Sequence, residues 1–383
     1  MRGAAEVGSI IRRLKPLLLA LPGFERLCLR LTRRHVRALM YHRFTDDPAA
    51  YPRRMPVAEF RRQLEHLARC CEVVAPDRQA ALEDGGARPA DRPLAVITVD
   101  DGYSDFHTHA FPLLQELGLP GVLFVTTGFV QGTCWMWWDR IRWALDHTAR
   151  RRFEFPFRGT TLSGDCSSEH GRAAIWQTLV PALRFVQDQE KEQVVAAVAA
   201  YLEVEIPLNA PPRYAAVTRD QLAAMAAAGL HVGAHTRTHP ILSRISEAEA
   251  REEIGGSRTD LADWLGRAPD WFAYTQGGPA DYTPETVALV EESGYRDCYV
   301  AYLDLHREGR RFARHRYHAA ADWDNFRWIV CGADYLVLRL RRRFGLQADG
   351  VGAVYWNGYE LAGGTMARGR ARTDHASRSE FPC

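Results

Sequence analysis

The sequence has little lysine, although it is rich in arginine. Lysine occurs only at Lys15 and Lys191, whereas Lys and Arg together number 49 of the 383 residues. We interpret this scarcity as codon bias. The 49 basic residues nearly balance 47 acidic ones, which leaves a formal net charge of +2. Because so small a net charge gives only weak long-range attraction to polyanions, the composition predicts no nucleic-acid partner.

The N-terminal region lacks an apolar stretch long enough to cross a bilayer. The run at 17–21 is too short for that, and the Pro22-Gly23 pair after it offers no small-residue cleavage site for a signal peptidase. We therefore predict a cytoplasmic protein with a basic and apolar N-terminal lead over residues 1–35. The lead could rest on an anionic membrane surface or pack as a helix on the domain, and export stays open as an alternative.

The cysteines show neither a zinc-type spacing nor a short disulfide framework. Eight of them are spread between Cys28 and Cys383, so we expect buried free thiols in a reducing compartment. The chain is long enough for one large domain with insertions or for two domains. Hydrophobic residues make up 46% of it, which is ordinary for a globular protein with a sizeable core.

Two adjacent acids follow an apolar segment rich in β-branched residues. Residues 94–99 read Leu-Ala-Val-Ile-Thr-Val and lead into Asp100-Asp101-Gly102. This pattern predicts a buried strand that delivers carboxylates to its C-terminal end. Because successive strand side chains point to opposite sides, Asp100 and Asp101 are expected to have different roles. One could bind a metal while the other acts as a base.

A pair of histidines spaced four residues apart supplies candidate metal ligands. His235 and His239 follow the short apolar segment 229–234. On a helical turn both rings would lie on one face and reach one cation. Two imidazoles and one carboxylate form a common ligand set for a hydrolytic metal ion. The alternative is a pair of surface histidines at the start of a helix.

The two motifs together resemble those of the polysaccharide deacetylase family, the NodB-homology group of carbohydrate esterase family 4. Thr98-Val-Asp-Asp-Gly102 is similar to the family's Thr-Phe-Asp-Asp-Gly, and His235-Thr-Arg-Thr-His239 fits its His-Ser/Thr-x-x-His. The resemblance implies that Asp100 is the general base. It also implies that Asp101, His235 and His239 bind a divalent metal, with zinc the expected ion.

The family's general acid is a histidine on a strand reading Leu-x-His. In a circularly permuted branch, which resembles poly-N-acetylglucosamine deacetylases, this strand comes first in the chain. Leu39-Met-Tyr-His42 looks like that motif with a tyrosine inserted. We therefore predict His42 as the general acid, since a group that titrates near neutrality suits proton delivery to an amine. His315 and His318 are the competitors.

The strand expected at 271–278 departs from the family pattern. Related sequences end it with Tyr-Pro-Tyr-Gly or Arg-x-Pro-Tyr, where an Arg steadies the base and a backbone N–H helps to hold the oxyanion. Here Tyr274-Thr-Gln276-Gly has neither that Pro nor an Arg. The resemblance still implies an oxyanion or substrate role for Gln276, through its N–H, and for Tyr274.

Residues 129–217 interrupt the alternation of strands and helices, and we predict an insertion there. It holds the aromatic residues Trp135, Trp137 and Trp138, a turn-rich stretch at 151–168 and two helices. The aromatic rings could line a glycan cleft, for which we select Trp138, or they could pin the insertion to the core.

Two features mark the C-terminal region. Residues 336–344 predict a strongly basic helix, which could contact a membrane or a phosphate-bearing substrate or could simply be solvated. The tail at 362–383 is rich in Gly, Ala, Arg and Ser, so we expect it to be disordered.

The resemblance implies a distorted (β/α) barrel of the NodB-homology type, with a helical insertion, over residues 36–345. The expected activity is metal-dependent removal of N-acetyl groups from N-acetylhexosamine units of a bacterial polysaccharide, oligosaccharide or lipid-linked glycan, as in exopolysaccharide biosynthesis. An O-acetyl esterase acting on a glycan and a non-catalytic glycan-binding protein are the alternatives.

Overall fold

The protein folds around a curled parallel sheet. A computed structural model describes residues 13–51, 53–83, 92–303 and 311–344, and the backbone of 355–356 and 359–360. Within these residues the sheet has eight strands, all paired in parallel. They are β1 (Arg37–Tyr41), β4 (Glu72–Val73), β5 (Leu94–Val99), β6 (Val122–Val125), β9 (His231–Ala234), β10 (Trp271–Ala273), β11 (Asp297–Tyr299) and β12 (Tyr317–His318). The order is β11-β10-β9-β6-β5-β1-β12, and β4 also pairs with β5.

The last segment of the sheet closes it into a barrel. β12 pairs with β1, and just before it Arg314 bonds to the other edge strand. The Arg314 N–H donates to the Cys298 carbonyl at 2.8 Å, and the Val300 N–H donates to the Arg314 carbonyl at 2.9 Å. Residues 314–318 therefore contact both β11 and β1. The distorted (β/α) barrel predicted from the sequence is confirmed.

Strand residues alternate between two apolar cores. Along β5, Val96 packs with Phe124 and Tyr299 in a small core made mostly of strand residues. Ile97 instead belongs to a larger core that includes helix residues such as Leu64. The small core therefore lies inside the barrel, and the larger core lies between the strands and the helices. Coverage on both faces explains why the strand is almost continuously apolar.

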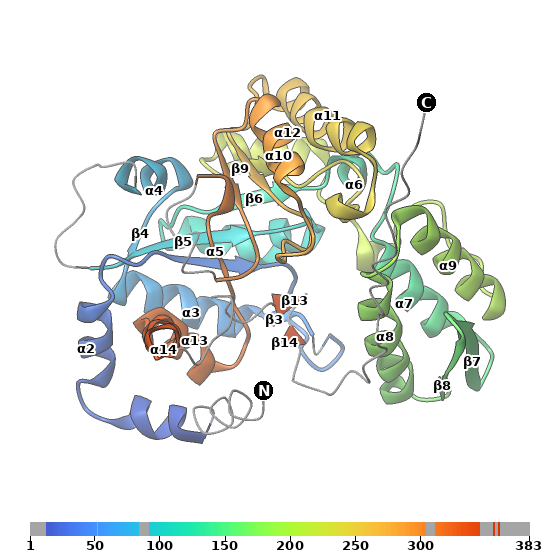
Figure 1. Cartoon of the computed structure of the whole chain (residues 1–383), viewed down its shortest axis with the longest axis horizontal. Helices are drawn as coiled ribbons and strands as arrows, with labels where there is room; N and C mark the ends of the chain where they lie inside the picture. The colour runs from blue at the N-terminus through green and yellow to red at the C-terminus, as the bar shows by residue number, and fades with distance from the viewer. Residues whose placement is uncertain are drawn as a thin grey trace, which may run out of the picture.

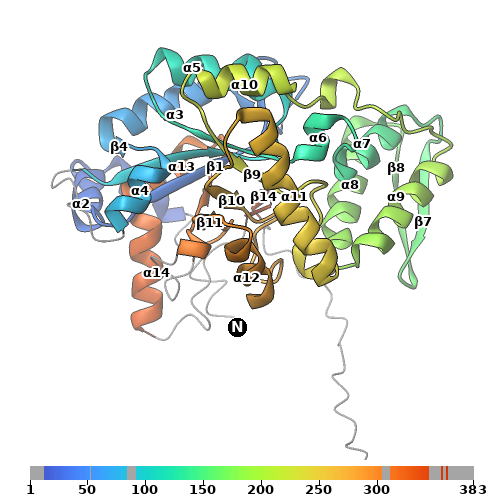
Figure 2. The same cartoon turned by 90° about the horizontal axis from the view of Figure 1, so that it is seen from above.

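Helices surround the barrel, as the two perpendicular views show (Figures 1 and 2). They are α3 (Val57–Cys70), α4 (Pro76–Glu83), α5 (Phe111–Glu116), α10 (Arg219–Ala227), α11 (Glu247–Leu265), α12 (Pro284–Glu292), α13 (Trp323–Cys331) and α14 (Ala333–Arg343). Residues 13–20 are also helical. The helix α2 (Phe24–Leu31) packs on α13 through a small core that contains Cys28 and Trp328.

The insertion forms a body with its own core, on the right of Figure 1. Its elements are α6 (Thr127–Gln131), α7 (Trp137–His147), β7 (Arg152–Phe157), β8 (Thr160–Asp165), α8 (Glu169–Leu183) and α9 (Asp188–Tyr201). The core gathers residues such as Ile141, Leu179 and Val198, all fully buried. The bounds 36–345 and 129–217, taken as domain limits, stay a prediction.

A β-hairpin occupies the stretch that the sequence described only as turn-rich. Strands β7 and β8 pair antiparallel from Arg152 to Asp165. The two connecting residues, Arg158 and Gly159, have φ of 47° and 76°. Positive φ at both central residues is typical of the two-residue turns that join twisted strands. An arginine in the first position is unusual there, which is why the sequence did not reveal the turn.

Two predictions on the ends of the chain concern residues outside the described ones. They are the first part of the N-terminal lead, residues 1–12, and the disordered tail expected at 362–383. The seven described cysteines are free thiols, as the sequence indicated. Among the described helices, none combines the length and the apolarity that crossing a bilayer requires.

The cap of α11 gives a first testable prediction. The Ser246 hydroxyl accepts the Glu249 N–H, and the Glu249 carboxylate accepts the Ser246 N–H. Ser246→Ala should therefore lower the free energy of unfolding by about 1 kcal/mol, measured by urea denaturation. Thr259→Ala, within the same helix, is the control and should change stability little. Equal stability of Ser246→Ala and the parent protein would contradict the capping role.

Candidate metal centre and active site

Asp101, His235 and His239 converge at the C-terminal mouth of the barrel. Asp101 Oδ1 lies 3.7 Å from His235 Nε2 and 3.5 Å from His239 Nε2, and all three side chains are buried. Bonds of about 2.0–2.2 Å to a tetrahedral ion would separate its ligand atoms by roughly 3.3–3.6 Å. One carboxylate and two imidazoles at this spacing therefore fit a divalent cation, with a position left open for water.

Hydrogen bonding and burial prepare the two imidazoles to act as ligands. His235 Nδ1 donates to the Ala273 carbonyl at 2.7 Å, which leaves its Nε2 lone pair facing Asp101. Burial lowers the pKa of His235 to about 4 and that of His239 to about 3. Both rings are therefore neutral at pH 7, the form that binds metal.

The histidine pair lies on a loop, and the prediction of a helical turn was wrong. Thr236 and His239 have φ of 65° and 63°, a left-handed conformation that an α-helix does not contain. The Thr236 hydroxyl accepts the His239 N–H at 3.0 Å and donates to the His235 carbonyl at 2.6 Å. This closure turns both rings toward one point, with their centroids 4.9 Å apart.

Neighbouring elements hold this loop from outside. The Glu253 carboxylate, on α11, accepts the N–H groups of Arg237 and Thr238 at 2.7 and 2.9 Å. Asp260, two turns along the same helix, binds the Arg237 guanidinium at 2.9 and 3.0 Å. On the other side the Gly128 N–H donates to the Arg237 carbonyl at 2.7 Å. These contacts fix the ligands through residues that do not themselves face the site.

The Asp100 carboxylate faces an arginine. Arg316 Nη1 donates to Asp100 Oδ1 at 2.6 Å and to the Thr98 hydroxyl oxygen at 3.2 Å, and all three side chains are buried. Burial alone would raise the pKa of Asp100, but the Arg316 guanidinium, together with the imidazoles of His235 and His42, holds that pKa below the usual value. The carboxylate is therefore ionised and able to accept a proton.

Arg316 is the functional residue that the sequence analysis missed. The family pattern places an arginine on the strand at 271–278, and this chain has none there. The structure brings one from the segment that closes the barrel, 216 residues from Asp100. In the stretch Arg314-His-Arg-Tyr-His318 the sequence motif indicates only the histidines as candidates. The signal that could have revealed Arg316 is its spacing from His318. The two residues are two apart, so on a strand both side chains face the same side.

A pocket of about 330 Å³ opens beside Asp101. Aromatic side chains line much of it, including Trp138, Trp176 and Tyr214. The Trp138 ring meets the His239 ring edge-on, with centroids 4.8 Å apart, so the pocket wall touches the candidate metal centre. Charged side chains, mostly arginines, line much of the rest. Aromatic walls combined with polar groups are typical of a small-molecule or sugar site.

The other two tryptophans of the insertion anchor it internally. Trp135 and Trp137 are buried in the core of the insertion. Trp135 Nε1 donates to the Pro207 carbonyl at 3.1 Å. Of the three rings considered for a glycan cleft, the structure thus brings only Trp138 to the pocket.

Two of the three candidate acid histidines line the pocket. His42, just past β1, and His318, on β12, lie with ring centroids 6.0 Å apart. Burial lowers the pKa of both, and the nearby carboxylates of Asp101 and Asp100 counteract this at His42. His315 Nδ1 instead bonds to the Tyr302 carbonyl at 3.0 Å, and His315 is not among the described residues that line the pocket.

The structure does not bring Tyr274 or Gln276 into the pocket. The Tyr274 hydroxyl donates to the Phe312 carbonyl at 3.2 Å, and its ring stacks on Tyr282 at 4.4 Å in the outer core. The substrate role of Tyr274 stays a prediction. Gln276 has a φ of 58°, and neither residue is among the described lining residues. The oxyanion role of the Gln276 N–H stays a prediction.

Comparison with known proteins identifies the family. Residues 87–150 and 177–298 match the family model described as polysaccharide deacetylase. The chain thus contains a polysaccharide deacetylase domain. It is accordingly a deacetylase, a hydrolase. The unmatched residues 151–176 cover the β7–β8 hairpin and the start of α8, so the gap falls inside the insertion.

The deacetylase also resembles several solved structures. They include the deacetylase PplD of Streptococcus pyogenes in complex with acetate (15% identity, 75% of this chain and 93% of that chain, TM-score 0.49). IcaB from Ammonifex degensii matches at 17% identity over 77% and 96% of the two chains, with a TM-score of 0.48. A de-N-acetylase from Aggregatibacter actinomycetemcomitans matches at 14% identity over 76% and 99%, with a TM-score of 0.47. No curated protein matches significantly.

Gly128 provides a test of the loop that carries the histidines. A Cβ there would lie 2.6 Å from the Arg237 carbonyl oxygen. Gly128→Ala should therefore displace the loop and weaken zinc binding at least tenfold, as loss of support behind metal ligands does. Gly255→Ala is the control, because its Cβ would meet only Ser293 Oγ at 3.7 Å. Zinc titration by calorimetry measures both, and equal affinities would contradict the structural role of Gly128.

Proposed function

We propose that this deacetylase removes N-acetyl groups from N-acetylhexosamine units of a bacterial polysaccharide, oligosaccharide or lipid-linked glycan, and that it needs a divalent metal, zinc being the expected ion. The observation that carries the proposal is the grouping of Asp101 with His235 and His239 beside an ionised Asp100. This grouping borders the aromatic pocket. A pocket with flat aromatic walls suits the faces of a sugar ring.

The chemistry divides among the residues at the mouth of the barrel. Asp101, His235 and His239 would hold the cation, which supplies Lewis acidity toward water and an acyl oxygen when bound. Asp100 accepts a proton from the attacking water, because Arg316 keeps its carboxylate ionised. The C–N bond of the acetamide then breaks, and the products are acetate and a free amine.

Protonation of the leaving amine is assigned to His42. Its imidazole lines the pocket, and its Nδ1 has no hydrogen-bond partner among the described residues. Because burial lowers the pKa of His42, a proton placed on the ring is readily given up to an amine nitrogen. His318, 6.0 Å away between ring centroids, is the alternative donor.

Metal dependence and the division between the two acids are testable together. The zinc-loaded protein should release acetate from N-acetylglucosamine oligomers, and a chelator should abolish the release. Asp101→Asn should lose both zinc and activity. Asp100→Asn should keep zinc but lose about 10²–10⁴-fold in kcat, the usual contribution of a general base. Chelator-insensitive release, or an Asp100→Asn variant with parental kcat, would contradict the assignment.

The role of Arg316 predicts a pH effect. Arg316→Gln leaves Asp100 buried without its cation, so the Asp100 pKa should rise. Activity needs the ionised carboxylate and is lost as pH falls through its pKa, so the acid limb of the pH–kcat profile should move to higher pH.

Arg314→Gln is the matched control for this variant. Arg314 precedes Arg316 by two residues in the chain. It forms a buried ion pair with Asp297 at 2.7 Å. This control should destabilise the fold comparably, yet leave the acid limb in place. An unmoved limb in Arg316→Gln, or the same movement in both variants, would show that Arg316 does not set the Asp100 pKa.

A further inference from the structure

The N-terminal helices expose leucines on one side. On the helix at 13–20, the exposed fraction is 43% for Leu14 and 66% for Leu17, and it is 55% for Leu21 just after the helix. On α2, Leu27 and Leu31 are 56 and 60% exposed. Spacings of three and four residues place each set along one stripe of its helix. These are five of the nine large hydrophobic side chains exposed in the described part of the chain.

The end of α14 extends this surface. Leu336 and Val337 pack against the core shared with α2. Leu340 and Phe344 follow at intervals of four residues and are 54 and 68% exposed. The stripe that packs beside α2 therefore continues past it as uncovered apolar surface.

Arginines dominate the charges around these apolar side chains. Arg26 and Arg30 flank the leucines of α2, and Arg339 and Arg343 flank those of α14; all four are exposed. Within 13–36 the only acid is Glu25, which pairs with Arg327. Within 333–344 the only acid is Asp334, which is not exposed. A chain with a net charge of only +2 thus concentrates positive charge beside its exposed leucines.

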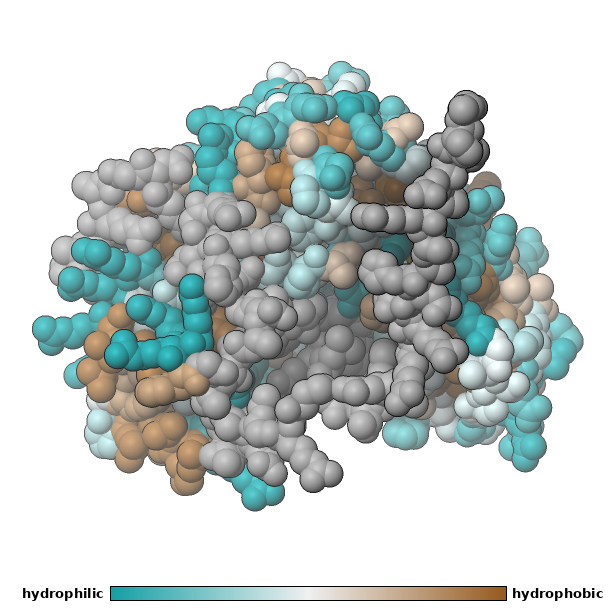
Figure 3. Space-filling model, viewed as in Figure 1, coloured by the Kyte–Doolittle hydropathy of each residue, from teal (hydrophilic) through white to brown (hydrophobic). Residues whose placement is uncertain are grey.

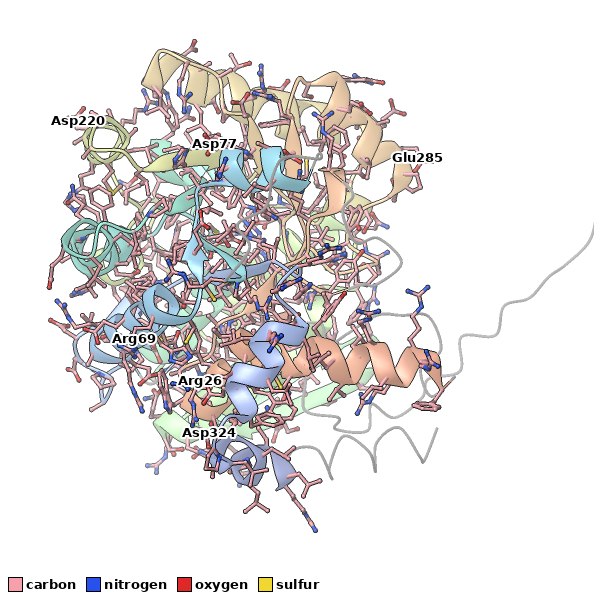
Figure 4. All side chains as sticks on the ribbon, turned by 90° about the vertical axis from the view of Figure 1, so that its left-hand side faces the viewer. Arg26, Arg69, Asp77, Asp220, Glu285 and Asp324 are labelled. Atoms are coloured by element: carbon pink, nitrogen blue, oxygen red, sulfur yellow. The ribbon has the colours of Figure 1, made fainter. Side chains whose placement is uncertain are left out.

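The figures show the two kinds of surface side by side. In Figure 3 hydrophobic residues gather at the lower left, over the helix at 13–20 and α2, and hydrophilic residues lie next to them over α14. Figure 4 turns this side to the viewer, with α2 in front of α14 and Arg26 at its edge. Asp324, labelled below it, is already engaged with Arg327 at 3.4 Å.

We propose that the helix at 13–20, α2 and the last turns of α14 form a docking face for an anionic phospholipid bilayer. The leucines enter the boundary of the acyl chains, and the arginines bind the headgroup phosphates. The apolar side chains favour a bilayer over a nucleic acid, because the phosphates of a nucleic acid would contact only the arginines. A second copy of the chain is disfavoured, because a two-fold contact would set these arginines against one another. The proposal is independent of the glycan chemistry.

Vesicle sedimentation with the full-length, zinc-loaded protein tests this docking face. The protein should bind vesicles of phosphatidylglycerol and phosphatidylcholine, bind pure phosphatidylcholine at least tenfold less, and dissociate at high salt. Leu27→Gln/Leu31→Gln should weaken partitioning at least tenfold, and so should Arg26→Glu/Arg30→Glu. Acetate release from soluble oligomers and circular dichroism verify that the variants are folded.

Matched controls come from exposed residues elsewhere. Phe185→Gln/Leu208→Gln removes two exposed hydrophobic side chains of the insertion, 56 and 90% exposed. Arg219→Glu/Arg267→Glu makes the same charge change far from α2 in the chain. Both control pairs should bind vesicles like the parent protein. The proposal is overturned if the parent protein ignores anionic vesicles or if the controls lose binding equally. It is also overturned if duplex DNA is bound in preference to vesicles, or if the leucines instead mediate a dimer in sedimentation velocity.

Discussion

The site depends on a sharp turn between two neighbouring carboxylates. β5 ends at Val99, and Asp101 adopts a φ of 77° directly after Asp100. This left-handed residue sends the Asp101 side chain to the two imidazoles, while Asp100 keeps its contact with Arg316. Because a non-glycine residue at positive φ is strained, the surrounding structure must hold it in place. Thr236 and His239 share that conformation, so the candidate centre gathers three of the six such residues in the described chain.

The insertion completes the site because it is tied to the barrel at this point. The Tyr103 hydroxyl, just after the two acids, donates to Asp139 at 2.6 Å, and Trp138 Nε1 donates to the Tyr103 oxygen at 3.2 Å. Arg43, beyond β1, stacks on the Tyr103 ring at 3.7 Å and pairs with Asp105 at 2.7 Å. These buried bonds fix the aromatic wall against the metal-binding residues. Pocket shape and metal geometry are therefore linked through one tyrosine.

The sequence predicted the features that local patterns determine. The family resemblance carried by the two motifs implied the barrel, and the same motifs predicted the cluster of Asp101 with His235 and His239. Those residues lie at strand ends, and parallel strands bring their ends to one mouth.

The rest required contacts between distant parts of the chain. Arg316 reaches Asp100 only because the last strand segment closes the barrel next to β1. The conformation of the histidine loop depends on Glu253 and Asp260, which no spacing rule connects to it. Tyr274 directly follows β10, and side chains alternate between the two faces of the sheet along this segment. Its side chain therefore packs in the larger core, between the strands and the helices.

X-ray absorption at the zinc edge tests the central claim most directly, because it reports the ligands of the bound ion. The account predicts a zinc ion with two imidazole nitrogens, one from each of His235 and His239, and with oxygen as every other ligand. His235→Gln should reduce the imidazole signal to one ring. A third imidazole, a sulfur ligand, or a spectrum unchanged by His235→Gln would contradict a centre built from Asp101, His235 and His239.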